Sequence, residues 1–147
     1  MTDIIVIDTN VAVKLYIPDP LSDYAENILQ SKTIYAPEWI QAEFYQAIWK
    51  YWNSNRLSGD EFREYIERFN QTPISLCRVT NTLLNKTLEL SLETGGTIYD
   101  CLFLAIALKY KTLLVTSDKK FIKKLKQTPY TKQIIDLADW AEKVSNA

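Results

Sequence analysis

Residues 4–8 read Ile4-Ile5-Val6-Ile7-Asp8, an apolar run that stops at an aspartate, and Leu113-Leu114-Val115 leads through Thr116-Ser117 to Asp118 in a similar way. Continuous runs of Ile, Val and Leu are typical of strands that are buried on both faces of a parallel sheet. Ligands of such sheets bind beyond the carboxyl ends of the strands, so we expect both aspartates at one rim. Carboxylates that share a rim repel each other unless a cation lies between them, and the usual candidate is a hard divalent ion with oxygen ligands.

The rest of the chain alternates strand and helix patterns. Further strands are expected at residues 33–36, 74–79, 112–115 and 133–135, and helices at 21–29, 40–51, 58–69, 83–92, 97–108, 118–126 and around Trp140. Ser58 and Glu61 have the spacing of a capping box, and Gly95-Gly96 marks a helix end. The helices at 40–51 and 58–69 are expected to form a hairpin on the sheet. We predict an α/β fold, with a mostly parallel central sheet of four to five strands flanked by helices.

Composition narrows the possible functions. Seventeen Lys and Arg residues against eighteen Asp and Glu give a formal net charge of -1, so a nucleic-acid partner would have to be held locally. Histidine is absent, which removes every mechanism that relies on imidazole. Cys77 and Cys101 have neither metal-ligand spacing nor the density of a disulfide scaffold. The N-terminus lacks the basic region of a signal peptide, and the longest apolar stretch, 101–108, is far short of the roughly 18 residues of a membrane span. We therefore expect a cytoplasmic protein with no membrane partner.

Four carboxylates are candidates for a shared acidic site. Asp8 and Asp118 follow strands, Glu43 lies on or beside the apolar face of its helix, and Asp100 heads the most apolar helix of the chain. Each also has a plain structural explanation. The two strand-end aspartates are good N-caps, and Glu43 could be a flanking residue that reaches for water. Asp100 could complete a capping box with Thr97 or simply favour the positive end of its helix. Four such positions together, two at strand ends and two at the starts of buried helices, favour a site.

The chain resembles the PIN-domain family, and in particular its small VapC-like ribonuclease toxins. The resemblance is carried by four segments that span nearly the whole chain: IVIDTNVAVKLY, APEWIQAEFYQAIWK, TIYDCLFLAIALKY and LLVTSDKKF. Each motif is short, but their order and spacing make the combination specific. The resemblance implies a single PIN-like domain over residues 1–147 and metal-dependent endonucleolytic hydrolysis of RNA. It also implies that the protein is the toxin of a toxin–antitoxin pair, a homodimer that a small cognate antitoxin neutralises.

The resemblance also implies roles for individual residues. The metal-binding and catalytic quartet would be Asp8, Glu43, Asp100 and Asp118, holding one or two Mg²⁺ or Mn²⁺ ions. We expect the two strand-end aspartates to be direct ligands, Asp100 a ligand or water positioner, and Glu43 a ligand of a second ion or a base. The residues expected to orient ligands or the scissile phosphate are Asn10, Thr116 and Ser117. Without histidine, phosphodiester hydrolysis calls for a metal that activates water and stabilises the leaving oxygen.

Some features leave substrate choice open. Gln46 stands where many relatives have asparagine, and neither Gly95-Gly96 nor the aromatic segment 49–52 matches a family motif. The lysines at 119, 120, 123, 124 and 126 favour either a local phosphate-attracting patch or a solvated amphipathic helix packed through Phe121, Ile122 and Leu125. The aromatic residues Trp49, Tyr51 and Trp52 would stack on bases, form an interface or belong to the core.

Three other functions are weighed against the nuclease. A phosphoacceptor signalling domain normally needs an acidic pair after the first strand, whereas Asp8 is followed by Thr9-Asn10, and the run at 74–79 ends without an aspartate. A haloacid-dehalogenase-type phosphatase would need a second aspartate where Asn10 stands. A catalytically silent PIN-like scaffold that only binds RNA or protein is disfavoured by the four intact carboxylates.

Overall fold

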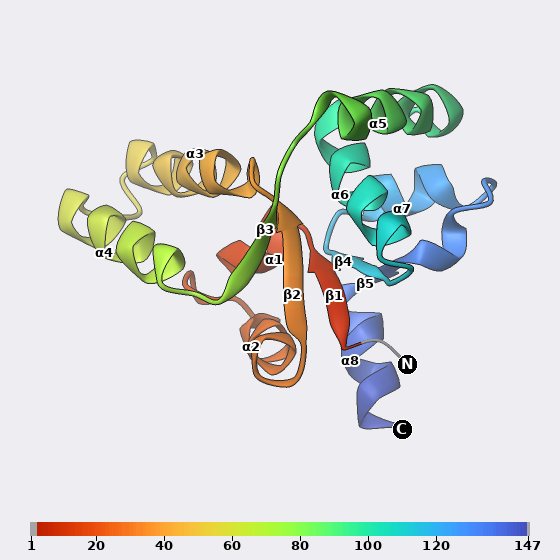
Figure 1. Ribbon diagram of the computed structural model, residues 1–147. Helices are drawn as coiled ribbons and strands as arrows, with labels where there is room; N and C mark the ends of the chain where they lie inside the picture. The colour runs from red at the N-terminus through yellow and green to blue at the C-terminus, as the bar shows by residue number, and fades with distance from the viewer. Residues whose placement is uncertain (1–2, 147) are drawn as a thin grey trace.

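The computed structural model describes residues 3–146. In this part of the chain five strands form one sheet in the order β3-β2-β1-β4-β5, and every neighbouring pair is parallel (Figure 1). Their bounds are β1 Ile4–Ile7, β2 Thr33–Pro37, β3 Ile74–Cys77, β4 Leu114–Thr116 and β5 Ile134–Asp136. The prediction of a mostly parallel sheet with four to five strands is confirmed.

Helices cover both faces of the sheet. Their bounds are α1 Thr9–Val13, α2 Ser22–Ser31, α3 Ile40–Asn53, α4 Gly59–Asn70, α5 Asn81–Thr94, α6 Ile98–Lys109, α7 Lys119–Leu125 and α8 Leu137–Ser145, with a 3₁₀ turn at Thr131–Gln133. Figure 1 shows α3 and α4 on one side of the sheet and α5, α6 and α7 on the other. The predicted α/β layering is therefore confirmed. Helix α1 was not among the expected elements, because five residues are too few to show a helical period.

Local capping signals set several helix ends as expected. Ser58 Oγ accepts from Glu61 N over 3.1 Å, and Glu61 Oε1 accepts from Ser58 N over 2.9 Å, so the capping box of α4 is formed. Gly95 ends α5 with φ +76°, in the left-handed region that glycine adopts at low cost. The predicted hairpin of α3 and α4 is also present, but α3 packs chiefly against α1 rather than directly on the sheet. The hairpin therefore lies over the first turn that follows β1.

The core is centred on α6. Every residue from 101 to 107 is buried, as the uninterrupted apolar sequence of this helix predicts. Helix α5 leaves Leu88 and Leu92 exposed, Leu92 by 73%. No single helix within residues 3–146 is long and apolar enough to cross a bilayer; α5 and α6 reach that length only together, and they are bent by 111°.

The strand order places a crevice between β1 and β4. The chain builds outward from β1 through β2 and β3 on one side, then returns through β4 and β5 on the other, and ligands of such sheets bind at the carboxyl ends where the order reverses. Strands β4 and β5 both end one residue later than predicted, because the register pairs Thr116 with Asp136. Thr116 is thus the last residue of β4, directly across from the end of β1.

Candidate active site

Asp8 is held rigidly at the carboxyl end of β1. Its side chain is only 6% exposed, and its backbone N–H donates to the Val115 carbonyl over 3.0 Å. Oδ1 accepts from the Thr9 N–H over 2.8 Å, which makes Asp8 the N-cap of α1. Oδ2 accepts from Thr116 Oγ1 over 2.9 Å and from Asn10 Nδ2 over 3.4 Å. The cap explanation is therefore correct but incomplete, because side chains from two other positions also fix the carboxylate.

Thr116 and Asn10 tie the ends of β1 and β4 together. The fully buried Thr116 hydroxyl donates to Asp8 and accepts from Asn10 Nδ2 over 3.2 Å and from the Asp118 N–H over 3.0 Å. One donor and two acceptor positions exhaust the capacity of a hydroxyl. Asn10 Oδ1 in turn accepts from the Ser117 N–H over 3.0 Å. These bonds set the path of the loop that carries Asp118.

Asp118 caps α7. Its Oδ1 accepts from the N–H groups of Lys120 and Phe121 over 3.0 and 3.1 Å, so the cap explanation is confirmed for this oxygen. Oδ2 makes no hydrogen bond with any residue from 3 to 146. The charge of Asp118 raises the pKa of both Asp8 and Asp100, so Asp118 lies close enough to repel the charge of each. One oxygen is thus structural and the other is free for a ligand.

Glu43 and Asp100 lie in the first turns of α3 and α6, and both are half-buried. Glu43 Oε2 is buried and has no hydrogen-bond partner among the described residues. The explanation that Glu43 is a flanking residue that reaches for water therefore does not fit this oxygen. Thr97 caps α6 by accepting from the Asp100 N–H over 3.1 Å. The carboxylate of Asp100 does not return a bond to the Thr97 N–H in the described structure, so the capping-box explanation fails.

Burial and mutual repulsion disfavour the charged forms of these carboxylates. Burial, followed by the charges of Asp100 and Asp118, raises the pKa of Asp8 to about 6, against the opposing effect of the Thr116 and Thr9 hydrogen bonds. Burial, followed by the charges of Asp8 and Asp100, raises the pKa of Glu43 to about 7, against the opposing effect of the nearby Thr9 hydroxyl. Burial and Asp118 raise the pKa of Asp100, while Thr97 and Lys124 lower it. Each of the four predicted carboxylates therefore lies close enough to at least one other for their charges to interact.

The oxygen atoms at this rim fit a hard cation that retains water. Three buried side-chain oxygens have no hydrogen-bond partner within residues 3–146: Thr9 Oγ1, Glu43 Oε2 and Ser117 Oγ. Thr9 and Glu43 lie near each other, and buried oxygens without a partner of this kind are places where a water or an ion can bind. Across the same residues, no three acidic side chains are close enough to hold an ion by themselves. Mg²⁺ takes one or two carboxylates and keeps several waters, so the rim fits a partly hydrated ion rather than a cage of four carboxylates.

Two hollows flank the acidic rim and meet on α3. One, of about 620 Å³, is lined by Thr9, Trp39, Ala42, Glu43, Gln46, Ala47, Lys50 and Tyr99. The other, of about 480 Å³, is lined by Asn10, Val13, Lys14, Ala47, Lys50, Tyr51, Ser54 and Arg56. Their cations were not among the predicted site residues. The available signal was the spacing of Lys50, which follows Glu43 by seven residues and so lies on the same helical face.

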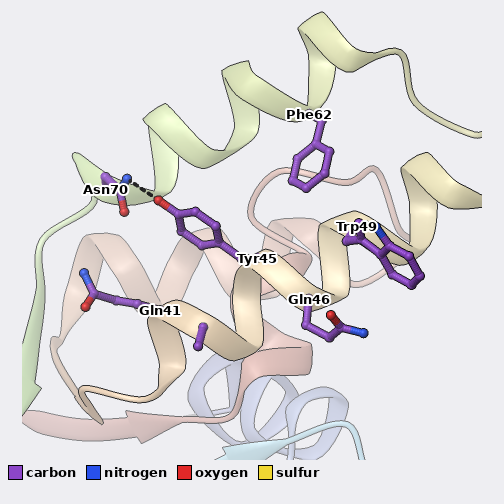
Figure 2. A pocket seen from close by; sticks show the side chains of 7 residues that line it. Gln41, Tyr45, Gln46, Trp49, Phe62 and Asn70 are labelled. Carbon is purple, nitrogen blue, oxygen red and sulfur yellow. Dashed lines mark hydrogen bonds between the residues drawn. The ribbon is translucent and has the colours of Figure 1, made fainter.

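A third hollow, of about 640 Å³, lies between α3 and α4 and contains none of the four carboxylates. Figure 2 shows Tyr45 pointing from α3 to Asn70, whose Nδ2 donates to the Tyr45 hydroxyl over 3.1 Å, with Trp49 and Phe62 farther along the hollow. Trp49 and Trp52 are exposed, so the core explanation is wrong for both, whereas Tyr51 is partly buried against the core.

Gln46 and the lysines of α7 lie outside the group of four carboxylates. Gln46 makes no hydrogen bond to Glu43 in the part of the chain described, and it faces the first and third hollows instead. Helix α7 buries Phe121 and Leu125 and exposes its lysines, as the amphipathic explanation predicts. Lys124 Nζ donates to the Gly95 carbonyl over 3.2 Å, so this lysine is partly engaged within the fold.

Comparisons with known proteins agree with this architecture. The sequence profile of the PIN domain matches residues 5–126. Ribonuclease VapC3 of Pyrobaculum aerophilum is 25% identical over 122 residues, which cover 82% of this chain and 93% of that protein.

Solved structures with the same fold are more distant in sequence. The PAE2754 protein of Pyrobaculum aerophilum superposes with a TM-score of 0.70 at 18% identity over 100% of both chains. VapC20 of Mycobacterium tuberculosis, a toxin that cleaves the sarcin–ricin loop, gives 0.61 at 16% identity, covering 80% of this chain and 92% of that one. A toxin–antitoxin complex from Klebsiella pneumoniae gives 0.58 at 15% identity, covering 90% and 96%. The profile match spans most of the sequence, and the chain therefore belongs to the PIN-domain family.

Proposed function

We propose that this protein is a divalent-metal-dependent endoribonuclease and the toxin of a toxin–antitoxin pair. The observation that carries the proposal is the convergence of four carboxylates, where charges within the set raise the pKa of Asp8, Glu43 and Asp100 and where buried oxygens have no partner. No lysine or arginine within residues 3–146 forms an ion pair with any of the four. Family membership and the names of the relatives, a ribonuclease and a loop-cleaving toxin, support the reaction.

Each site residue receives a role from its position. Asp8 and the free oxygen of Asp118 would bind Mg²⁺ or Mn²⁺, and Asp100 would bind the ion directly or through water. When bound, such an ion supplies activation of water and stabilisation of charge on the phosphate. Glu43, with a pKa of about 7, is available near neutral pH to accept a proton from the attacking water. The unpartnered hydroxyl of Ser117 is placed to donate to a phosphate oxygen.

A cleavage assay tests the proposal. Purified protein is incubated with total RNA in chelator, in Mg²⁺ and in Mn²⁺, beside an Asp8→Asn variant. Cleavage should require a metal and should vanish in the variant. Cleavage that persists in excess chelator while the variant is inactive would refute the metal mechanism. RNA binding without cleavage under all conditions would favour the silent scaffold. The phosphoacceptor alternative gains no support, because β3 ends at Cys77 and is followed by Arg78, with no acceptor aspartate.

The proposed partners are a second copy of the chain and a small antitoxin, with the cytoplasm as the compartment. An antitoxin segment that is basic or aromatic would find opposite charge at the acidic rim, and its release would depend on salt where the contact stays exposed. The exposed leucines of α5 offer apolar surface that a homodimer would cover. Light scattering that shows a monomer at micromolar concentration, with no toxicity on expression alone, would refute the toxin assignment and leave the nuclease intact.

A further inference from the structure

We propose that single-stranded RNA reaches the acidic rim along one groove that crosses Lys50, here called the Lys50 groove, made of the first and second hollows. Its cations, Lys14, Lys50 and Arg56, would hold phosphates, and Tyr99 would stack on an unpaired base. The inference rests on the proposed ribonuclease function and names the path and strandedness of its substrate.

The two hollows adjoin beside the site and share two lining residues. Ala47 and Lys50 line both, so the Lys50 side chain lies where they meet. The consecutive residues Thr9 and Asn10 line one hollow each, directly after the buried Asp8. A chain that crosses Lys50 from one hollow into the other therefore passes the first turn of α1, where Asp8 is held.

The cations of the groove have no carboxylate partners. The only ion pair within the described residues joins Arg63 to Asp60 on the exposed surface of α4. Lys14 Nζ donates to the Asn10 carbonyl over 3.3 Å, and the Arg56 guanidinium lies 5.6 Å from the centre of the Tyr51 ring. Three positive side chains around a hollow of about 480 Å³ give the local attraction that the net charge of -1 does not supply.

The aromatic end of the groove indicates a single strand. Tyr99 is 55% exposed and lines the same hollow as Glu43, so a base stacked on its ring would place the adjoining phosphate near the rim. The ring centres of Trp39 and Tyr99 are 6.0 Å apart with a 51° angle between the planes, which leaves no slot for a base between them. The free face of Tyr99 is therefore the stacking surface. Only an unpaired base offers its face to a side chain in this way.

Binding is measured separately from cleavage. Fluorescence anisotropy follows a short labelled single-stranded RNA in Mg²⁺, in an Asp118→Asn background that prevents cleavage. Lys50→Met keeps the aliphatic stem and removes the charge, and the exposed Lys86→Met on α5 is the matched control. If Lys50 contacts a phosphate, its variant should flatten the plot of log affinity against log salt by about 0.7, whereas the control should leave the slope unchanged.

The stacking role has its own variants. Tyr99→Ala should weaken binding roughly 5- to 150-fold, and Tyr99→Phe should retain most of the affinity because it keeps the ring. Tyr24→Ala, at an exposed tyrosine of α2, is the matched control. Duplex RNA of the same sequence should bind more weakly and should not respond to Tyr99→Ala.

The outcomes separate this inference from the function on which it rests. Equal effects of Lys50→Met and Lys86→Met, or equal binding of duplex and single strand with no response to Tyr99→Ala, would overturn the Lys50 groove even if the protein cleaves RNA. Binding that depends on Lys50 and Tyr99, in a protein whose unmutated form cleaves no RNA, would support the groove while refuting the nuclease.

Discussion

Thr116 Oγ1 donates a 2.9 Å hydrogen bond to Asp8 Oδ2, joining the end of β4 to the end of β1 across 108 positions of sequence. The same hydroxyl oxygen accepts from the Asp118 N–H over 3.0 Å. One buried side chain therefore orients a carboxylate on one strand and the loop that carries the second carboxylate on the other. Preorganisation of this kind spares the site from rearranging when a ligand binds.

Thr116→Val should impair both stability and cleavage. Valine has nearly the same shape but leaves the Asp118 N–H and part of the Asp8 carboxylate without a partner, which costs about 1–3 kcal/mol for buried groups. The lost bond is also one that lowers the pKa of Asp8, so the carboxylate should become harder to ionise. Urea denaturation and initial cleavage rates measure the two effects. Thr116→Ser keeps the hydroxyl and should resemble the unmutated protein; a valine variant with full activity would contradict the role.

Asp118→Asn tests whether Asp118 only caps α7 or also binds the metal ion. Asparagine caps a helix about as well as aspartate, so α7 should remain intact. Removing one of several mutually repelling charges should leave the metal-free protein equally or more stable, while Mg²⁺-induced stabilisation shrinks and cleavage falls by orders of magnitude. Thermal melts with and without Mg²⁺ measure this.

Asp136→Asn is the matched control for that experiment. Asp136 also ends a strand and caps a helix, accepting from the Ala138 N–H over 3.2 Å. Its variant should keep the Mg²⁺ shift and the cleavage rate. An Asp118 variant that behaves like the Asp136 variant would remove Asp118 from the site.

Stability of the metal-free protein should fall as pH rises through weak acid. The folded-state pKa of Asp8 is raised from 3.8 to about 6 and that of Glu43 from 4.5 to about 7. Between the ordinary and the raised values the folded state binds more protons than the unfolded state, so the free energy of unfolding decreases with rising pH. The stabilisation that these raised pKa values give to the folded state is full below about pH 4 and is lost by about pH 7.

A pH series of urea melts in chelator, with Glu43→Gln beside the unmutated protein, measures this contribution. The variant should lose the part of the slope that lies nearest neutral pH. Mg²⁺-induced stabilisation should grow over the same range, because ionised carboxylates bind the ion. Identical slopes in the two proteins would show that Glu43 does not titrate there.

Gly96→Ala should disturb the packing between α6 and α7. A Cβ atom at Gly96 would lie 2.7 Å from the buried Phe121 ring and 2.9 Å from Cys101 Sγ, so the backbone at Gly96 or these side chains of α6 and α7 must shift. Overpacking of this kind costs about 1–3 kcal/mol. Because Asp100 and Asp118 stand at the starts of these helices, cleavage per folded molecule should fall as well.

Gly95→Ala is the control for that variant. A Cβ at Gly95 meets nothing within 4 Å, but φ is +76°. The change should therefore cost about 1 kcal/mol of stability through backbone conformation alone and leave the cleavage rate of the folded protein intact. Equal loss of specific activity in both variants would contradict the packing argument.

The central strands β1 and β4 were predictable because burial on both faces leaves an uninterrupted apolar run, as in residues 4–7 and 113–115. Other features were decided by packing between distant segments. The spacing of Leu88 and Leu92 predicts a helix, yet nothing local says that no neighbour covers them. An aspartate at the end of a strand marked two residues of the site, but Asp136 also ends a strand, and its charge is not among those that raise the pKa of Asp8, Glu43 or Asp100.

The cations of the Lys50 groove could not be assigned in advance. Lys14 and Lys50 converge only because α3 packs against α1 across more than thirty positions of sequence, and neither residue lies in a motif that predicts phosphate binding. The lysines that the sequence did single out, after Asp118, lie along the exposed face of α7.

Helix α3 presents Glu43 to the acidic rim and Tyr45 to the hollow beside α4, so its two faces belong to different surfaces. Packed helices shift as rigid bodies by about 1–2 Å, and a movement of that size is a large fraction of an Mg–O bond of about 2.0–2.1 Å. A molecule that binds between α3 and α4 and displaces α3 therefore alters the coordination of an ion that it never touches.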